Sequence, residues 1–183
     1  MRFANIFTLM LLLVLIGGCG SVSDDLNPSE TDQRPPVQTG TTGPAVGQSA
    51  PDFTLSDTLG NSITVTSVIP QVKGVVIYFT MWCPICDTHM SNMRSNVVPL
   101  FPNVRFFLID YVSGSVADAR NAQVGNGYSG PPFTVLADTN QAVLGAYAAT
   151  MGTPVIIDAA GVIRMSEDYK DGVRLVSILG SLP

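Results

Sequence analysis

The chain has 183 residues, of which 46% are hydrophobic and 13% are charged, and its formal net charge is −5. The low charge density and the lack of a Lys/Arg cluster in the sequence argue against a nucleic-acid partner. The length suits one domain with a substantial core and is too short for two comfortable domains.

The first residues predict export. Arg2 precedes a mostly apolar run from Ile6 to Ile16, which is too short to cross a bilayer because a crossing needs about 20 residues. The run ends in Leu15-Ile16-Gly17-Gly18-Cys19, which resembles the bacterial lipobox. The resemblance implies cleavage before Cys19 and lipid on its thiol, and Gly20, in place of an aspartate, implies the outer membrane. A plain secretory signal with a chance cysteine is the alternative.

Three segments follow from this pattern. Residues 1–18 are predicted to be a lipoprotein signal peptide, residues 19–45 a flexible tether and residues 46–183 the folded domain. The tether is rich in Ser, Thr, Pro, Gly and Asp, so it cannot bury enough apolar surface to offset its chain entropy.

Strand and helix patterns alternate through the domain. Residues 52–55 and 62–66 flank a turn-rich segment and predict a small hairpin. Continuous β-branched and aromatic runs predict buried strands at 75–80 and 103–112. Between these strands, apolar residues at helical spacing predict a helix over 86–98 that Pro99 ends.

The second half of the domain continues the alternation. Ser115 can cap a helix to about residue 124, and a strand is predicted at 133–138. Asp138 and Gln141 form a capping-box-like start for a helix to about residue 149. A final hairpin over 153–166 and an amphipathic helix over 173–182 complete an α/β sandwich around a mixed sheet.

Two apparent motifs fail on their context. Residues 125–130, GNGYSG, match the dinucleotide pattern G-x-G-x-x-G, but two prolines and a strand follow where the pattern requires a helix. Haem attachment requires C-x-x-C-H, whereas Asp87 and Thr88 separate the second cysteine from the histidine.

Cys83 and Cys86 are the candidate reactive residues. In an exported protein they meet an oxidising compartment, yet a bridge between them closes too small a loop to stabilise the fold much. Cys83 begins the predicted helix, where the helix dipole lowers a thiol pKa, and Pro84 is well tolerated in a first turn. Cys86 lies one turn on and can resolve a mixed disulfide at Cys83.

The strand, the sequence Trp82-Cys83-Pro84-Ile85-Cys86 and a later Thr153-Pro154 resemble the thioredoxin superfamily over residues 46–183. The front of the domain resembles TlpA-like thiol-disulfide oxidoreductases and the wider redoxin group. The resemblance implies a thioredoxin-like sandwich, with a central mixed sheet flanked by helices and an N-terminal β-hairpin. It also implies a cis Pro154 beside the cysteines, a substrate strand paired with the backbone at Thr153, and a shielding or substrate-contact role for Trp82. A trans proline beginning an edge strand and plain packing of the tryptophan are the alternatives.

Two departures from the family concern proton transfer. Ile77 occupies the position of the buried aspartate of thioredoxin, so any acid-base group must lie elsewhere. His89 stands where TlpA-like reductases often carry a glutamate, and its ordinary pKa near 6.5 suits proton transfer. Helical spacing turns it towards Cys86 more than towards Cys83. The alternative is a solvated histidine on an exposed helix face.

The predicted function is disulfide exchange with periplasmic protein substrates, as a reductase by resemblance, without a cofactor or a metal. A membrane-embedded electron donor is the expected redox partner. One alternative is a peroxiredoxin-like peroxidase, since Thr80 completes a T-x-x-C motif, although Val76 replaces that family's proline. Another is a copper or zinc carrier that uses Cys83, Cys86 and His89, because soft thiolates bind these metals.

Overall fold

The computed structural model describes residues 37–183. The predicted signal peptide, Cys19 and most of the predicted tether lie outside the described residues. Contacts group residues 37–183 into one compact unit. No helix within this part of the chain has the length and apolar character needed to cross a bilayer.

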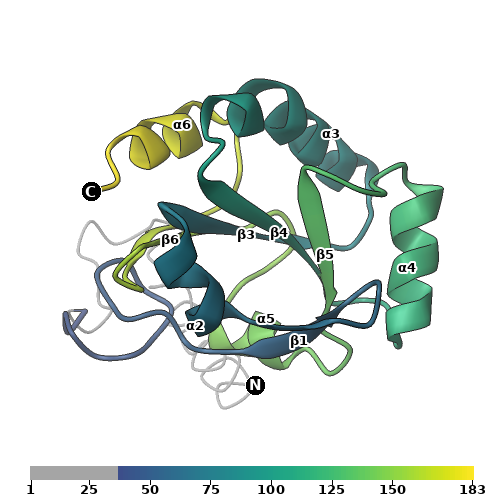
Figure 1. Cartoon of the computed structure of the whole chain (residues 1–183), viewed down its shortest axis with the longest axis horizontal. Coiled ribbons are helices and arrows are strands. Elements are labelled where there is room, and N and C mark those ends of the chain that lie inside the picture. The colour runs from purple at the N-terminus through teal and green to yellow at the C-terminus, as the bar shows by residue number, and fades with distance from the viewer. Residues whose placement is uncertain (1–36) are drawn as a thin grey trace, which may run out of the picture. The chain divides into compact units, whose positions relative to one another are not determined.

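A mixed sheet forms the centre of the domain (Figure 1), with the strand order β2-β1-β5-β4-β3-β6-β7. Strands β3, β4 and β5 run parallel to one another, while β1, β2, β6 and β7 join by antiparallel pairing. The strands are β1 Thr54–Asp57, β2 Ser62–Thr64, β3 Gly74–Thr80, β4 Val104–Asp110, β5 Phe133–Ala137, β6 Pro154–Asp158 and β7 Ile163–Ser166.

Helices cover both faces of the sheet. The α-helices are α2 Val65–Val68, α3 Pro84–Asn92, α4 Val116–Gly125, α5 Ala142–Ala146 and α6 Val173–Gly180. Helix α2 continues as a 3-10 turn, η1 Ile69–Gln71, and α3 as a π-helical turn, η2 Met93–Val97, and a 3-10 turn, η3 Val98–Leu100. Helices α3 and α6 lie on one side of β3 and β4, and α2 and α5 lie on the other (Figure 1).

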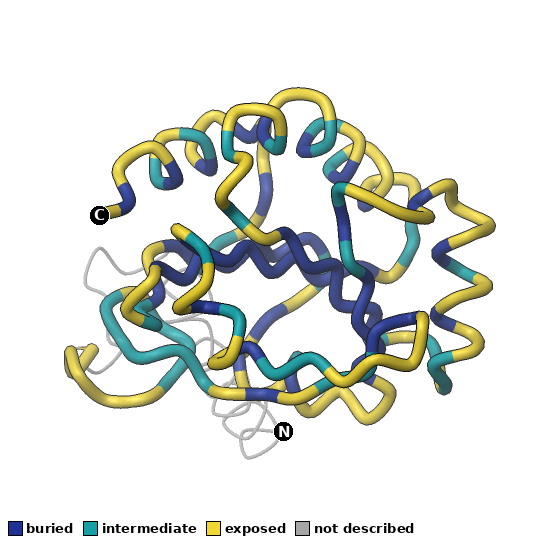
Figure 2. The backbone as a smooth tube through the Cα atoms, in the orientation of Figure 1, coloured by how far each residue is buried: buried dark blue, intermediate teal, exposed yellow. Residues whose placement is uncertain are grey.

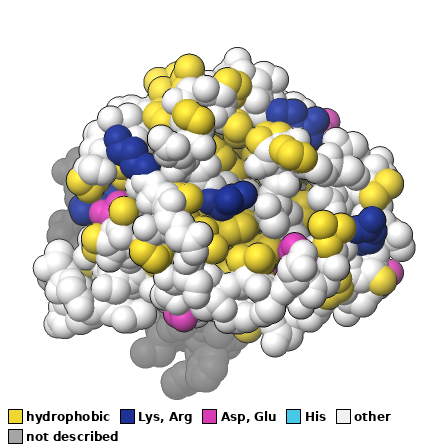
Figure 3. Space-filling model, viewed as in Figure 1, with side chains coloured by type: hydrophobic (Ala, Val, Ile, Leu, Met, Phe, Trp, Pro, Cys, Tyr) yellow, Lys and Arg dark blue, Asp and Glu magenta, His cyan; other side chains and the backbone are white. Residues whose placement is uncertain are grey.

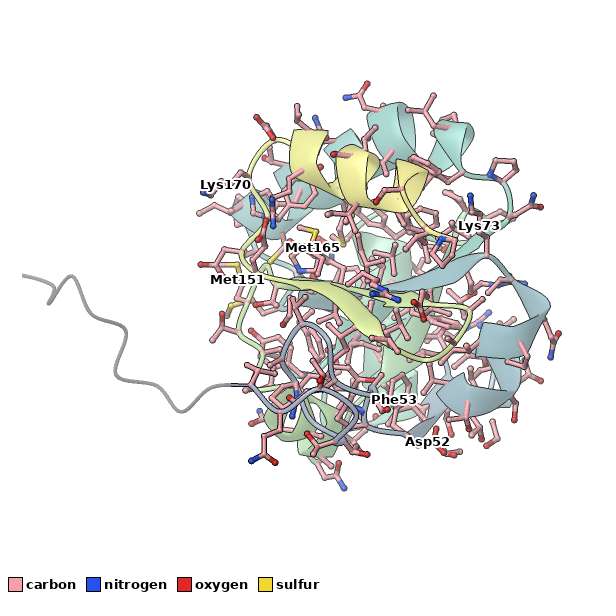
Figure 4. All side chains as sticks on the ribbon, turned by 90° about the vertical axis from the view of Figure 1, so that its left-hand side faces the viewer. Asp52, Phe53, Lys73, Met151, Met165 and Lys170 are labelled. Carbon is pink, nitrogen blue, oxygen red and sulfur yellow. The ribbon has the colours of Figure 1, made fainter. Side chains whose placement is uncertain are left out.

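Strand β3 is buried along its whole length (Figure 2) because its side chains alternate between two cores. Val76 and Tyr78 pack with α3 and α6, whereas Val75, Ile77 and Phe79 pack with α2 and α5. Side chains fill the space on both faces of the sheet (Figure 4), and Met165 of β7 belongs to the core beneath α6. The buried strand therefore fixes the position of residues 81–83, which join it to the start of α3.

The predicted strands and their mixed sheet are confirmed, including the N-terminal hairpin of β1 and β2. The strand predicted to residue 66 ends instead at Thr64, because Val65 begins a helix that buries Val65 and Ile69. The helix predicted from Asp138 spans only Ala142–Ala146.

The start of that helix differs from a capping box. Gln141 adopts a left-handed conformation, with φ of 58°, and makes no side-chain cap. The carboxylate of Asp138 instead accepts hydrogen bonds from the backbone of Val143 and Leu144, at 3.3 and 2.8 Å. By contrast, Ser115 caps α4 as predicted, accepting from the backbone N–H of Asp118 at 3.1 Å.

Residues before 46 also contact the domain. Ser49 donates a backbone hydrogen bond to the carbonyl of Thr41, and Gly47 donates one to the carbonyl of Ile163 in β7, both at 2.9 Å. Ser49 pairs in addition with Val162. These bonds extend the folded unit into residues that the sequence analysis assigns to the tether.

Candidate active site

The two cysteines lie where β3 ends and α3 begins. Cys83 is the N-cap residue of α3, and its Sγ accepts the backbone N–H of Cys86 at 3.2 Å. Pro84 occupies the first helical position, as expected. The two sulfurs lie 2.7 Å apart as free thiols, with Cys83 partly exposed and Cys86 fully buried. An incoming disulfide therefore reaches Cys83 first.

The two thiols of the pair are hydrogen-bonded to each other, which couples their pKa values. Burial and the hydrogen bond that it donates to Cys86 raise the pKa of Cys83. Burial would also raise the pKa of Cys86, but hydrogen bonds from Cys83, the backbone and Thr80 outweigh it, and the pKa is lowered. The expectation of a lowered pKa at Cys83 is therefore wrong for this reduced pair. The helix start does supply N–H donors to Cys83, but the neighbouring sulfur competes for the negative charge.

Trp82 is held beside Cys83 by a buried carboxylate. Its indole N–H donates to Oδ2 of Asp110, at the end of β4, at 2.8 Å, and its backbone N–H donates to the Thr80 hydroxyl at 3.1 Å. The backbone of Trp82 is left-handed, with φ of 59°, which is uncommon for a bulky residue and is found at functional sites. Asp110 thus fixes the orientation of the side chain next to the exposed thiol.

Tyr128 forms the other side of this aromatic group. Its ring centroid lies 6.2 Å from that of Trp82, and its hydroxyl donates to the Asp87 carboxylate at 2.6 Å. The guanidinium of Arg94 lies over the Tyr128 ring, with its carbon 4.2 Å from the centroid. Asp87 follows Cys86 directly, so Tyr128 ties the first turn of α3 to the loop before β5.

His89 points to the sheet and is partly buried. Its Nδ1 lies 2.9 Å from the hydroxyl of Tyr78, and its ring lies 4.7 Å, centroid to centroid, from that of Tyr169. Burial lowers the pKa of His89 below its ordinary value. Two tyrosines therefore hold the imidazole in place. One of them, Tyr78, belongs to the same buried cluster as Cys86.

Thr153 and Pro154 lie at the start of β6, next to β3. Pro154 is the register partner of Tyr78, whose side chain belongs to the same buried cluster as Cys86. The cis conformation predicted for Pro154 is wrong: within residues 37–183 the one cis bond joins Pro131 and Pro132. Trans is the preferred form of an X–Pro bond, and here the Thr153 carbonyl accepts the backbone N–H of Phe79 at 3.2 Å. That carbonyl is paired with β3 rather than left open for a substrate strand.

Two other candidate sites do not join the dithiol. A cavity of about 360 Å³ lies between β5, α4 and the loop after β1, and neither cysteine lines it. Residues 125–130 contribute to a turn and to this cavity, and strand β5 follows them, as the sequence context predicts.

Among the described residues, no three His, Cys, Asp or Glu side chains are grouped so that they could hold a metal ion. On the face shown in Figure 3, lysines and arginines are separate rather than gathered in a patch.

Sequence reasoning missed Tyr78, Asp110 and Tyr128 as parts of the site. Asp110 gave the clearest signal, because a carboxylate ends an otherwise apolar buried strand, and the carboxyl ends of parallel strands meet at one edge of a sheet. Tyr78 and Tyr128 gave none, since aromatic residues are ordinary in strands and loops.

The fold, with a C-x-x-C pair at the start of α3, defines an oxidoreductase of the thioredoxin superfamily. Residues 46–166 match the AhpC/TSA family, and the chain belongs to that family. It is 30% identical over 126 residues to the thiol-disulfide oxidoreductase ResA of Geobacillus thermodenitrificans, in an alignment that covers 67% of this chain and 69% of the relative.

Solved structures agree on the fold. A candidate protein disulfide isomerase from Bacteroides thetaiotaomicron matches with a TM-score of 0.63 and 20% identity, covering 75% of this chain and 89% of that chain. A secreted Mycobacterium tuberculosis disulfide oxidoreductase, homologous to E. coli DsbE, matches with a TM-score of 0.55 and 22% identity, covering 71% and 96%. Both likenesses support the thioredoxin-like sandwich predicted from the sequence.

Proposed function

We propose that the protein is a thiol-disulfide reductase for protein substrates in the bacterial periplasm. The observation that carries the proposal is the asymmetry of the dithiol: Cys83 is partly exposed at the start of α3, while Cys86 is fully buried 2.7 Å away. Cys83 attacks a substrate disulfide, and Cys86 then attacks Cys83 and releases the substrate thiol. The substrate gains two electrons and the protein keeps a Cys83–Cys86 disulfide.

Apolar side chains around Cys83 favour a protein substrate. Met81 and Ile85 are 44% and 56% exposed, and they flank Cys83 in the chain. Exposed apolar groups at a reactive centre offer a contact surface to a polypeptide. By the resemblance to the thioredoxin superfamily, we assign Trp82, Thr153 and Pro154 to the same substrate-binding surface.

The test of activity is reduction of insulin disulfides by the reduced protein, with Cys83→Ala as the inactive control. The direction of electron flow is tested by the potential of the Cys83–Cys86 couple in defined thiol buffers. A value near that of thioredoxin, about −270 mV, supports a reductase, and a value near about −120 mV identifies an oxidant and overturns that direction.

We also propose that lipid on Cys19 anchors the protein to the outer membrane, facing the periplasm, and that a membrane-embedded donor returns electrons to the dithiol. The support is the sequence Leu15-Ile16-Gly17-Gly18-Cys19 after an apolar run. Cys19→Ser is expected to abolish incorporation of labelled fatty acid and to change membrane fractionation. Unchanged fractionation of this variant refutes the anchor.

A peroxidase is the second candidate, favoured by the match to the AhpC/TSA family. Thr80 and Cys83 form T-x-x-C, and the Thr80 hydroxyl lies near the sulfurs, since it contributes a hydrogen bond to Cys86. Peroxide consumption by Cys83→Ala and Cys86→Ala separates the two candidates. A peroxidase retains the first oxidation step without Cys86, whereas a disulfide reductase does not consume peroxide with either variant.

A further inference from the structure

Tyr78 is a buried residue of β3 that faces the dithiol helix. Its side chain belongs to the same buried cluster as Cys86 and Met90 of α3. Its hydroxyl lies 2.9 Å from Nδ1 of His89. Burial, followed by the charges of Cys86 and Cys83 and by a hydrogen bond involving Cys86, raises its pKa well above the ordinary value. Tyr78 therefore keeps a protonated hydroxyl, which contacts the imidazole of His89 while its side chain packs in the same cluster as Cys86.

His89 is fixed in this position from several elements. Tyr169, in the segment between β7 and α6, packs against the His89 ring at an interplanar angle of 37°, and Tyr78 meets that ring edge-on at 86°. A Cβ built on Gly152, just before β6, would lie 3.6 Å from the imidazole. The titratable groups facing His89 are thus Tyr78 and Tyr169, with Cys86 reached through Tyr78. Asp171 is the charged group that acts on Tyr169.

In the second chemical step, Cys86 attacks the mixed disulfide at Cys83, and this attack requires the Cys86 thiol to lose its proton. In the reduced pair, the hydrogen bond from Cys83 is the largest influence that lowers the pKa of Cys86. In a mixed disulfide, Cys83 has no S–H to donate, while Cys86 is still fully buried. Burial then favours the neutral thiol, which is a poor nucleophile. Resolution therefore needs a group that removes the Cys86 proton.

We infer that Tyr78 and His89 form the proton relay of the resolving step, with Tyr78 linking Cys86 to a histidine that does not touch the reacting sulfurs. This inference rests on the proposed function. The Cys86 proton passes to the Tyr78 oxygen while the Tyr78 proton passes to Nδ1 of His89. The Cys86 thiolate attacks the Cys83 sulfur, the Cys83–substrate S–S bond breaks, and the substrate departs as a thiolate. The imidazolium then returns its proton to solvent or to the departing thiolate.

The protonation states suit these roles. Because burial lowers the pKa of His89, its imidazole is neutral near pH 7 and can accept a proton. Because the pKa of Tyr78 is raised, its hydroxyl stays protonated and transmits a proton without forming a stable tyrosinate. Ile77, in place of the family's buried aspartate, points into the opposite core.

The test uses the full-length reduced protein and a bis(nitrobenzoate) disulfide, which releases one coloured thiolate on attack by Cys83 and a second on resolution by Cys86. The variants are Tyr78→Phe and His89→Gln. Tyr147→Phe is the matched control, because Tyr147 is also buried but donates to the Pro51 carbonyl, at 2.7 Å, in the core on the other side of the sheet. Stopped-flow absorbance separates the two phases over pH 5.5–8.5.

In Tyr78→Phe and His89→Gln, the second phase is expected to slow on the order of a hundredfold near neutral pH, as for a lost general base, and its pH midpoint to move upwards. The first phase and the Tyr147→Phe control should match the wild type. In a Cys83→Ala background, thiolate absorbance should show a higher pKa for Cys86 when Tyr78 is Phe. A second phase as fast as that of the wild type in both relay variants overturns the relay. If only one of the two variants folds, the rate of its second phase is the test. Failure of the wild type to release the second thiolate refutes the proposed function instead.

Discussion

Replacement of Asp110 by Asn tests the anchoring of Trp82. The Asp110 carboxylate is fully buried and accepts four hydrogen bonds. Oδ1 receives the backbone N–H groups of Val112 and Ser113 at 3.1 and 3.0 Å. Oδ2 receives the indole N–H of Trp82 at 2.8 Å and the Ser113 hydroxyl at 2.6 Å. Asn offers one acceptor oxygen, so an NH₂ group must face one of these two pairs of donors.

The size of the effect follows from which donor can adapt. If the NH₂ group faces Trp82 and Ser113, the serine hydroxyl can rotate and accept, but an indole N–H can only donate. One hydrogen bond to a charged acceptor is then lost, which costs about 1.5–3 kcal/mol. The reverse orientation leaves two backbone donors without the acceptor, which costs at least as much. We expect Asp110→Asn to reduce the free energy of unfolding by about 2 kcal/mol.

Two measurements check this expectation. Urea unfolding followed by far-ultraviolet circular dichroism gives the free energy. Emission of Trp82, the one tryptophan of the chain, reports its surroundings and should shift when the indole is released. Ser113→Ala is the control, because it removes a different donor to the same carboxylate and should likewise cost about 1.5–3 kcal/mol, but without altering emission. Equal stability and emission in Asp110→Asn and the wild type would refute the anchor.

Three further predictions concern the dithiol, His89 and the sheet. An alkylating reagent should modify Cys83 before Cys86 because Cys83 is partly exposed whereas Cys86 is fully buried, and Cys86→Ala should accumulate mixed disulfides with substrates in gel analysis; equal accumulation in Cys83→Ala would contradict the assigned roles. The folded pKa of His89 lies below the unfolded value of about 6.5. Its contribution to stability is therefore fully present above about pH 6.5 and is lost as pH falls below that value and through the folded pKa. Urea unfolding at pH 7.5 and 5.5 should show a smaller pH dependence in His89→Gln, and an unchanged dependence would argue against burial of the ring. Gly74→Ala should destabilise by about 1–3 kcal/mol, since the added Cβ would lie 3.1 Å from the backbone oxygen of Ile157 as well as 2.6 Å from Leu182 Cδ1; a melting temperature equal to that of the wild type would refute this close packing.

The sequence alone determined the elements whose signal is local. An uninterrupted apolar run identifies β3, because a strand buried on both faces has no polar side to alternate with. The spacing of Cys83 and Cys86 behind it identifies the reactive pair, since a helix start is defined within a few residues. Ser115 predicts the start of α4 for the same reason. The family resemblance then implied a central mixed sheet flanked by helices, while the order of its strands came only from the structure.

Only the tertiary structure decided which side chains act on the pair. Asp110 meets Trp82 across 28 residues of sequence, and Tyr78 meets His89 across 11, from a strand to a facing helix. The trans bond at Pro154 and the raised pKa of Cys83 also differ from what the motif implies. Hydrogen-bond partners and the coupling of pKa values depend on distances of a few ångströms between separate elements, and those distances arise from packing.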